Sequence, residues 1–259
     1  MLVAALVALF YLPWVAFAAC CMFVVLLAAM EWSRLASLAA WPRAVFVACC
    51  LAGSAASVPG VLPGEPGRAL LLAAVAAWVV GSVVVLRRRR LPTGAIGGSL
   101  AGLLLLVPAA AAVFVLYLRS PMVLLGAMAV VWLSDSAAYF AGRAFGRHKL
   151  APAISPGKTW EGVAGAMVAT VAFGAMCGTF FYDLMPEFVR ASAVPPAAAS
   201  LLAVVIAGFG IVGDLIESLA KRIAGVKDSG RLLPGHGGIL DRIDALLPAL
   251  PVAALAYLT

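Results

Sequence analysis

The sequence predicts an all-α polytopic membrane protein with about eight or nine transmembrane helices. The first observation behind this fold class is composition: of 259 residues, 65% are hydrophobic, 11% are charged, and the mean hydropathy is +1.11. An ordinary globular domain is about half apolar and roughly a quarter charged. The composition therefore excludes a soluble enzyme, a disordered chain and a disulfide-stapled secreted module. The five cysteines lie in apolar runs without a C-x-x-C pair, and we interpret them as small hydrophobic side chains.

The second observation is that apolar runs long enough to cross a bilayer recur along the chain. A transmembrane helix needs about 20 mostly apolar residues to cross roughly 30 Å of hydrocarbon. The first run contains Pro13, which predicts either one kinked or tilted span or two shorter helices. The candidate spans are Leu2–Met30, Ala44–Leu62, Ala69–Leu86, Ala95–Leu118, Pro121–Ala141, Val163–Tyr182, Ala199–Leu219 and Ala245–Leu258.

The third observation is that the basic residues alternate between the two sides of these spans. One alternating set of connections holds 15 of the 18 lysines and arginines, and the other holds only Arg68, Arg119 and Arg190. By the positive-inside rule the basic set faces the cytoplasm, which predicts a multi-pass protein of the inner (plasma) membrane. The net charge of +7 is then a topology signal rather than a sign of nucleic-acid binding. We interpret Arg87–Arg90 as an orientation and lipid-headgroup anchor.

The two halves of the chain differ in where their ionisable residues lie. Residues 1–118 hold almost no polar residue inside a span, which predicts a transmembrane scaffold, and Glu31 at a span end is expected to be interfacial. In residues 119–259, ionisable residues penetrate or closely flank the spans. Charges at that depth are costly and usually face a cavity or one another. We therefore predict that residues 119–259 form the catalytic region.

The first polar cluster of this region is centred on Asp135, within the otherwise apolar segment that contains Ser134–Tyr139. A carboxylate at that depth needs a cation, which Arg143, Arg147 or a metal ion would supply. Asp135 is therefore a candidate metal ligand.

The second polar cluster, Ile154–Gly162, leads into a predicted span. Its Gly-Lys-Thr triplet is also found in P-loops, but Pro152 stands where that motif needs glycine, and no strand is expected before it. Lys158 remains a candidate phosphate-binding charge, and Thr159 a hydroxyl donor, close to a helix N-terminus. Glu161 is expected either to cap that helix or to take part in function.

The third and richest cluster begins where the span Ala199–Leu219 ends. At helical spacing, four polar residues lie on one face: Asp214, Glu217, Ser218 and Lys221. In the following loop, the glycines of Gly235–Gly238 let backbone amides approach a ligand closely. Asp241 and Asp244 then share one face of the next helical turn.

The acidic residues of these clusters predict a site for a hard cation. Oxygen ligands from Asp214 and Asp241, joined by Asp135 or Asp244, without a Cys–His set, indicate Mg²⁺. Lysines and arginines beside such carboxylates are typical of sites that bind polyphosphates. The residues therefore predict phosphoryl or nucleotidyl transfer at the cytoplasmic membrane face, without distinguishing the two.

The run from Ser218 to Asp244, SLAKRIAGVKDSGRLLPGHGGILDRID, closely resembles the signature of the phosphatidate cytidylyltransferases. Ser134–Tyr139 and Ser155–Gly162 also resemble blocks of that family, so the resemblance covers about residues 120–259. It implies that CTP and phosphatidate give CDP-diacylglycerol and pyrophosphate, with Mg²⁺ required. It also implies that Asp214 and Asp241 hold Mg²⁺ with K⁺ as the second ion, and that the protein works as a homodimer among membrane lipids.

On this hypothesis a phosphatidate oxygen attacks the α-phosphorus of CTP, and Lys221 and Asp241 are catalytic. His236 is expected either to donate to the leaving pyrophosphate or to pack within the glycine-rich loop. Two alternatives stay open: a CTP-dependent lipid-alcohol kinase and an ion-coupled transporter. The residues expected to bind the nucleotide and lipid phosphates are Lys158, Thr159, Arg222, Lys227 and Asp228.

Overall fold

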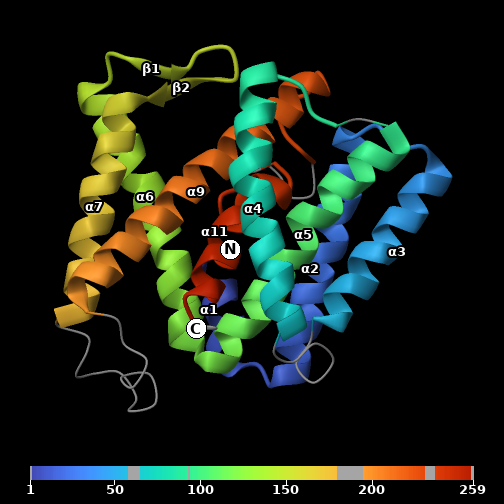
Figure 1. Cartoon of the computed structure of the whole chain (residues 1–259), viewed down its shortest axis with the longest axis horizontal. Helices are drawn as coiled ribbons and strands as arrows, with labels where there is room; N and C mark the ends of the chain where they lie inside the picture. The colour runs from blue at the N-terminus through green and yellow to red at the C-terminus, as the bar shows by residue number, and fades with distance from the viewer. Residues whose placement is uncertain (1, 58–64, 93, 180–194, 231–236, 258–259) are drawn as a thin grey trace.

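A computed structural model describes residues 2–57, 65–92, 94–179, 195–230 and 237–257, and this part of the chain is helical apart from one small hairpin (Figure 1). The helices are α1 (Leu2–Tyr11), α2 (Trp14–Leu35), α3 (Ala40–Ala56), α4 (Glu65–Arg88), α5 (Gly94–Arg119), α6 (Pro121–Phe145), α7 (Trp160–Thr179), α9 (Pro196–Ile223), α10 (Leu240–Ile243) and α11 (Leu246–Leu255). The strands are β1 (Lys149–Ala151) and β2 (Ser155–Thr159).

The helices form two groups on either side of α11 (Figure 1). In one group α7 packs against both α6 and α9, and in the other α3 packs against α2 and α5. The short helix α11 contacts α4, α5, α6 and α9, and its Ala249 and Ala254 are fully buried. Because α10 directly precedes α11, the centre of the bundle fixes the position of the acidic turn that carries Asp241.

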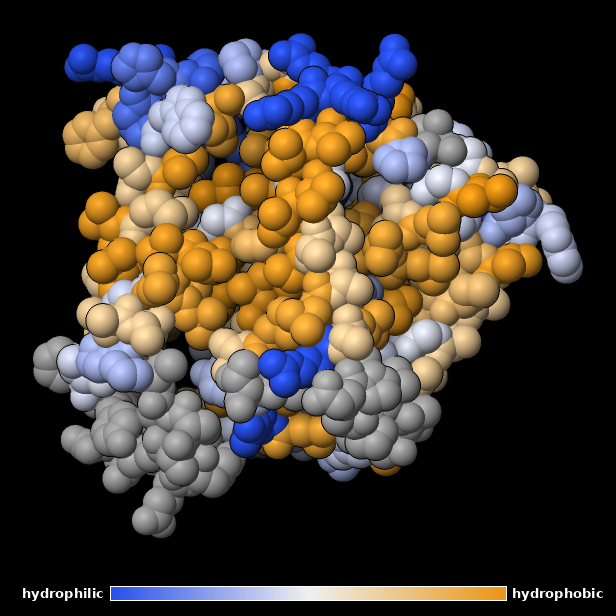
Figure 2. Space-filling model, in the orientation of Figure 1, coloured by the Kyte–Doolittle hydropathy of each residue, from blue (hydrophilic) through white to orange (hydrophobic). Residues whose placement is uncertain are grey.

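The composition and length of the helices agree with a membrane protein. Among the described residues, six helices are long and apolar enough to cross a bilayer, namely α2, α4, α5, α6, α7 and α9. The helices α3 and α11 are shorter, at 17 and 10 residues, and coincide with two other predicted spans. Figure 2 shows a broad apolar band across the molecule, with hydrophilic residues gathered mainly at the end that carries the hairpin. The chain is therefore a multi-pass, essentially all-α membrane protein.

The first apolar run is divided at Pro13 into two helices, which confirms one of the two alternatives expected from the sequence. Helix α1 ends at Tyr11 and α2 begins at Trp14, and the proline between them is extended, with ψ 152°. Proline has no backbone N–H and fixes its own φ, so it interrupts a helix in the interior but is tolerated where one begins. The result is a ten-residue α1 followed by the 22-residue α2.

An antiparallel hairpin joins α6 to α7 and was not predicted. In its register, Lys149 of β1 lies opposite Thr159 of β2, and Ala151 lies opposite Ser155. The expectation that no strand precedes the Gly-Lys-Thr triplet is therefore wrong. Strands of three and five residues are too short to show a clear period-two pattern, which is why the sequence did not reveal them. The hairpin lies at the same end of the bundle as the last turn of α9 (Figure 1), and its Lys158 contacts Asp214 of that helix.

Candidate active site

The polar face of α9 is held together by contacts one helical turn apart. Ser218 Oγ donates to Asp214 Oδ1 at 3.2 Å, and Lys221 Nζ lies 2.5 Å from Glu217 Oε2. Both contacts join residues at i and i+4, which are neighbours on a helix surface. Only 4% of the Glu217 side chain is exposed, so Lys221 offsets the cost of burying that carboxylate.

Asp241, in α10, is surrounded by hydrogen-bond donors. Lys221 Nζ donates to its Oδ1 at 2.7 Å, while its Oδ2 accepts from the amides of Gly238 at 2.7 Å and Ser229 at 2.9 Å. Burial acts to raise the pKa of Asp241, but the hydrogen bonds from Lys221 and the two amides outweigh it and lower the pKa to about 2. Asp241 is therefore an ionised carboxylate in a fixed orientation.

A second ion pair connects the hairpin to α9. Lys158 Nζ in β2 lies 2.6 Å from Asp214 Oδ2. Asp135, on α6, interacts electrostatically with both members of this pair. Arg143, one of the expected partners of Asp135, instead donates to the Tyr139 hydroxyl at 3.2 Å. The cation that faces Asp135 thus comes from the hairpin.

Asp244 links the two ion pairs. Its carboxylate interacts with Asp214 and with Lys221, and its Oδ1 accepts from the amide of Ala245 at 2.8 Å. Burial raises the pKa of Asp244, and the negative charge of Asp214 raises it further. Asp214 and Asp241, which are separated by 27 positions in the chain, are therefore members of one charged cluster.

Three other polar residues lie around this cluster. Arg222 Nε donates to the carbonyl of Ile154 at 3.4 Å, so it lies beside the hairpin. Thr159 is buried, and its hydroxyl caps α7 by accepting from the amide three residues on, at 3.1 Å. The Glu161 carboxylate accepts from the backbone N–H of His148 and lies 2.6 Å from its Nδ1, which ties the start of the hairpin to α7.

The remaining predicted residues belong to the loop between α9 and α10. Lys227 and Asp228 are exposed, and His236 lies outside the described residues. Their roles toward nucleotide and pyrophosphate stay predictions. Gly237 has a φ of +84°, a conformation that favours glycine, and it leads directly into the amide that binds Asp241.

Glu31 is a residue of the site that the sequence analysis assigned to the membrane interface, and that interpretation is wrong. The residue is fully buried, and its carboxylate accepts hydrogen bonds from Ser229 Oγ at 2.8 Å and from the amides of Ile239 at 3.0 Å and Leu240 at 2.8 Å. These contacts join positions 198 to 209 residues apart, so no local pattern could reveal them.

The carboxylate oxygens of the cluster are the kind of ligand that a hard cation binds. The carboxylates of Asp135, Asp214 and Asp244 interact with one another, and oxygen ligands are those that Mg²⁺ prefers. Within the described ranges, no group of three or more Asp, Glu, His or Cys side chains is arranged to hold a metal ion. Each of the two main predicted ligands instead forms an ion pair with a lysine.

These observations define a membrane-embedded protein with a lysine–carboxylate site at one end of its helical bundle. Comparison with known sequences gives its family. The model of the cytidylyltransferase family matches residues 1–259, and the chain therefore belongs to that family.

Individual relatives carry a more specific name. A phosphatidate cytidylyltransferase from Pseudomonas aeruginosa is 40% identical over 238 residues, which cover 89% of this chain and 83% of the relative. Proteins of the same name from Haemophilus influenzae and Brucella suis are 43% identical over 128 residues and 49% identical over 135 residues, respectively. These two alignments cover 49% and 50% of this chain but only 43% of each relative, so the chain matches less than half of their length.

Proposed function

We propose that this protein transfers the cytidylyl group of CTP to phosphatidate, which gives CDP-diacylglycerol and pyrophosphate. The observation that carries the proposal is the pair of lysine–carboxylate contacts, Lys158–Asp214 and Lys221–Asp241, gathered at one end of a multi-pass bundle. Membership of the cytidylyltransferase family and the shared name of the relatives support this choice of substrates.

The reaction is an in-line displacement at phosphorus. A phosphate oxygen of phosphatidate forms a bond to the α-phosphorus of CTP, and the bond from that phosphorus to the oxygen bridging to the β-phosphate breaks. The lipid phosphate is already an anionic nucleophile, so the reaction needs no covalent enzyme intermediate. The task of the protein is to hold two mutually repelling anions in line and to stabilise the charge that develops on pyrophosphate.

The two lysines supply this stabilisation by exchanging partners. Each lysine is paired with an aspartate, and on binding of CTP it would turn to phosphate oxygens, which a lysine binds as a compact cation. The side chains of Lys158 and Asp214 are 23% and 32% exposed, against 16% and 10% for Lys221 and Asp241. The more exposed pair opens at lower cost, because its charges remain partly solvated. Lys158 is therefore the first to engage the triphosphate.

Asp214 and Asp241, the two carboxylates that this exchange releases, would hold Mg²⁺, together with the K⁺ that the family resemblance implies. Asp135 and Asp244 are the neighbouring carboxylates that would complete the set of ligands. A divalent ion bound there would offset the negative charge of the triphosphate. Asp241 keeps its orientation when Lys221 leaves, because the amides of Ser229 and Gly238 still donate to Oδ2.

A cavity of about 330 Å³ beside the hairpin supports a lipid as the second substrate. It joins the end of α4 to the hairpin and to α9, and its lining is apolar, with residues such as Leu86, Ile154 and Leu215, apart from Arg89. Leu215 directly follows Asp214 of the charged cluster. An apolar recess with one guanidinium suits the glycerol and first acyl carbons of phosphatidate, with the lipid phosphate directed toward the arginine.

The orientation that we propose follows from the basic residues at the ends of the helices. The basic ends of α4, α6 and α9 lie on the hairpin side, which the positive-inside rule assigns to the cytoplasm of a cell with this protein in its inner membrane. With α3 and α11 counted as crossings, the bundle would have eight spans. We also propose a homodimer, which mass measurement in detergent or nanodiscs tests directly.

Labelled nucleotide distinguishes this proposal from its rivals. Purified protein is supplied with phosphatidate, Mg²⁺ and CTP labelled at either the α- or the γ-phosphate. We expect α-label in a lipid-soluble product that requires phosphatidate, and γ-label in pyrophosphate. Transfer of γ-label to an added lipid alcohol, with release of CDP, would indicate a kinase. Ion movement across liposomes without any labelled lipid would indicate a transporter.

A further inference from the structure

Glu31 is an ionisable side chain in the half of the chain that otherwise contributes apolar spans, and it is completely buried. A carboxylate removed from water is costly unless donors replace the lost hydration. Within the described part of the chain, Glu31 has three such donors, which come from Ser229, Ile239 and Leu240, about two hundred positions away. Its position is therefore explained by the loop that it binds, and not by packing within α2.

The donors to Glu31 flank Asp241 on both sides. The amides of Ile239 and Leu240 lie where α10 begins, so their bonds to Glu31 fix the turn that carries Asp241. Ser229 donates its backbone N–H to Asp241, and its hydroxyl lies 2.8 Å from Glu31 Oε2 and 3.0 Å from Asp241 Oδ2. A hydroxyl has one proton, so it donates to one of these carboxylates at a time. When the Ser229 hydroxyl donates to Glu31, the Ser229 side chain can keep its position after Lys221 leaves Asp241.

Two glycines of the loop are required by the same carboxylate. A Cβ atom on Gly230 would collide with Glu31 Oε1, and one on Gly238 would collide with both oxygens of Glu31 and with Ser229 Oγ. Gly238 also donates its amide to Asp241. These glycines therefore allow the loop backbone to close onto α2, as well as toward a ligand.

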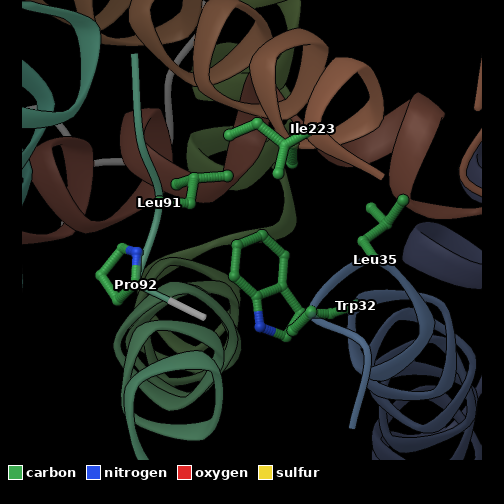
Figure 3. A pocket seen from close by; sticks show the side chains of 7 residues that line it. Trp32, Leu35, Leu91, Pro92 and Ile223 are labelled. Atoms are coloured by element: carbon green, nitrogen blue, oxygen red, sulfur yellow. The ribbon is translucent and has the colours of Figure 1, made fainter. Parts of the chain in front are cut away.

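The segment of α2 around Glu31 is itself firmly anchored. Trp32 Nε1 donates to the carbonyl of Gly98 at 2.9 Å, and a Cβ atom on Gly102 would overlap the Trp32 ring. Figure 3 shows Trp32 with Leu91 and Pro92 on one side and Leu35 on the other. The space between these side chains has a volume of about 10 Å³. The backbone next to Glu31 is therefore held by the packing of Trp32.

We propose that Glu31 is a positioning residue of the active site: it holds Ser229 and the first turn of α10 so that Asp241 faces Lys221. The catalytic arrangement is then incomplete without the N-terminal half of the chain. This inference rests on the proposed nucleotidyl transfer for its kinetic consequence, while its structural consequence is independent of that function.

The test compares Glu31→Gln with Ser33→Ala in the purified full-length protein. Glutamine keeps the size of the side chain but replaces one acceptor oxygen with an NH₂ donor. Ser33 is a matched control, because it is equally buried on the same helix and its hydroxyl donates only within α2, to Met30 O at 2.7 Å. We expect kcat of Glu31→Gln to fall about tenfold to a hundredfold, since small misplacements cost that much. The KM for phosphatidate should stay unchanged, and Ser33→Ala should keep both parameters.

Amide hydrogen exchange supplies a readout that does not depend on activity. Residues 237–245 should exchange faster in Glu31→Gln than in the wild-type protein or in Ser33→Ala. Wild-type kcat and wild-type exchange in this segment would overturn the proposal, as would a lower melting temperature with unchanged kcat. If Glu31→Gln does not fold, Ser229→Ala takes its place, with several-fold lower kcat expected and unchanged kcat contradicting the proposal. A wild-type protein that labels no lipid would refute the proposed function, and hydrogen exchange would still test the role of Glu31.

Discussion

Asp241 and Asp214 each form an ion pair with a lysine, but the surroundings of the two pairs differ. Asp241 is 10% exposed and accepts from the Lys221 ammonium at one oxygen and from two backbone amides at the other. Asp214 is 32% exposed and is contacted by Lys158 from the hairpin and by the hydroxyl of Ser218. The Asp241 carboxylate is held by backbone amides as well as by a lysine, whereas the Asp214 carboxylate is held by side chains.

This difference indicates that the two ion pairs have different roles. Lys221 is shared with the buried Glu217, so its removal would leave two acidic groups without their cation. Among the described residues Lys158 forms one ion pair, with Asp214; it also interacts with the charge of Asp135, and it lies on a short hairpin. The buried pair therefore serves both stability and catalysis, while the exposed pair serves mainly to receive substrate.

The largest effect is expected from Lys221→Met. Loss of this ammonium leaves Glu217 and Asp241 unpaired, and breaking a buried ion pair on one side costs roughly 3 to 5 kcal/mol. We expect a clear drop in melting temperature in detergent, together with at least about a hundredfold lower turnover. Thermal unfolding and lipid labelling of the same preparation check the prediction. A variant with wild-type stability would show that the two pairs are equivalent, contrary to the comparison.

Lys158→Met should act on substrate binding instead. The Lys158–Asp214 pair is partly solvated, so it contributes about 1 kcal/mol or less to stability, and the melting temperature should change little. Loss of a charge-assisted contact to the triphosphate should raise the KM for CTP about tenfold. Initial rates measured over a range of CTP concentrations test this, with Lys158→Arg as the variant that retains charge. A KM at the wild-type value would remove Lys158 from the nucleotide site.

Arg89→Gln tests the proposed binding of phosphatidate in the cavity beside the hairpin, which Arg89 lines. A single arginine near the membrane surface contributes about 1 kcal/mol to the attraction of anionic lipid. Its loss should therefore raise the KM for phosphatidate in mixed micelles roughly fivefold. The matched control is Arg88→Gln, which removes the same charge from the neighbouring position outside the cavity lining. Equal effects of the two substitutions would reduce Arg89 to part of a general basic anchor.

The smallest effect is expected from Ser218→Ala. The hydroxyl contributes a neutral donor to the partly exposed Asp214, at 3.2 Å, and such hydrogen bonds contribute about 1 kcal/mol or less. We expect kcat to fall about threefold and the melting temperature to stay the same. A loss as large as that of Lys221→Met would mean that Asp214 is held as rigidly as Asp241.

The sequence could predict features that lie within one segment of the chain, and the resemblance to a family pointed to the grouping of Asp214 with Asp241. The polar face of α9 follows from i and i+4 spacing, and its contacts Ser218–Asp214 and Glu217–Lys221 agree with that spacing. The apolar spans follow from run length, and the break before α2 follows from Pro13. Each of these features is encoded within one continuous segment of the chain.

The missed features depend on contacts between distant segments. Glu31 lies at the end of an apolar run, where an interfacial position is the ordinary explanation, and only the folded chain brings it to Ser229. The hairpin strands are short and contain Pro156 and Gly157, which are typical of turns rather than strands. The glycines of the loop opposite Glu31 did not point to it, because glycine there equally suited a phosphate-binding loop.

Transfer of α-label from CTP to phosphatidate by the wild-type protein and by Asp241→Asn tests the central claim most directly. Asparagine keeps the shape of the side chain but removes the charge that Lys221 and a bound cation would share. We predict lipid-soluble label from the wild-type protein and a rate lower by roughly a hundredfold to a thousandfold in the variant, which should still elute as a folded protein. Equal rates of label transfer by the two proteins would contradict the account.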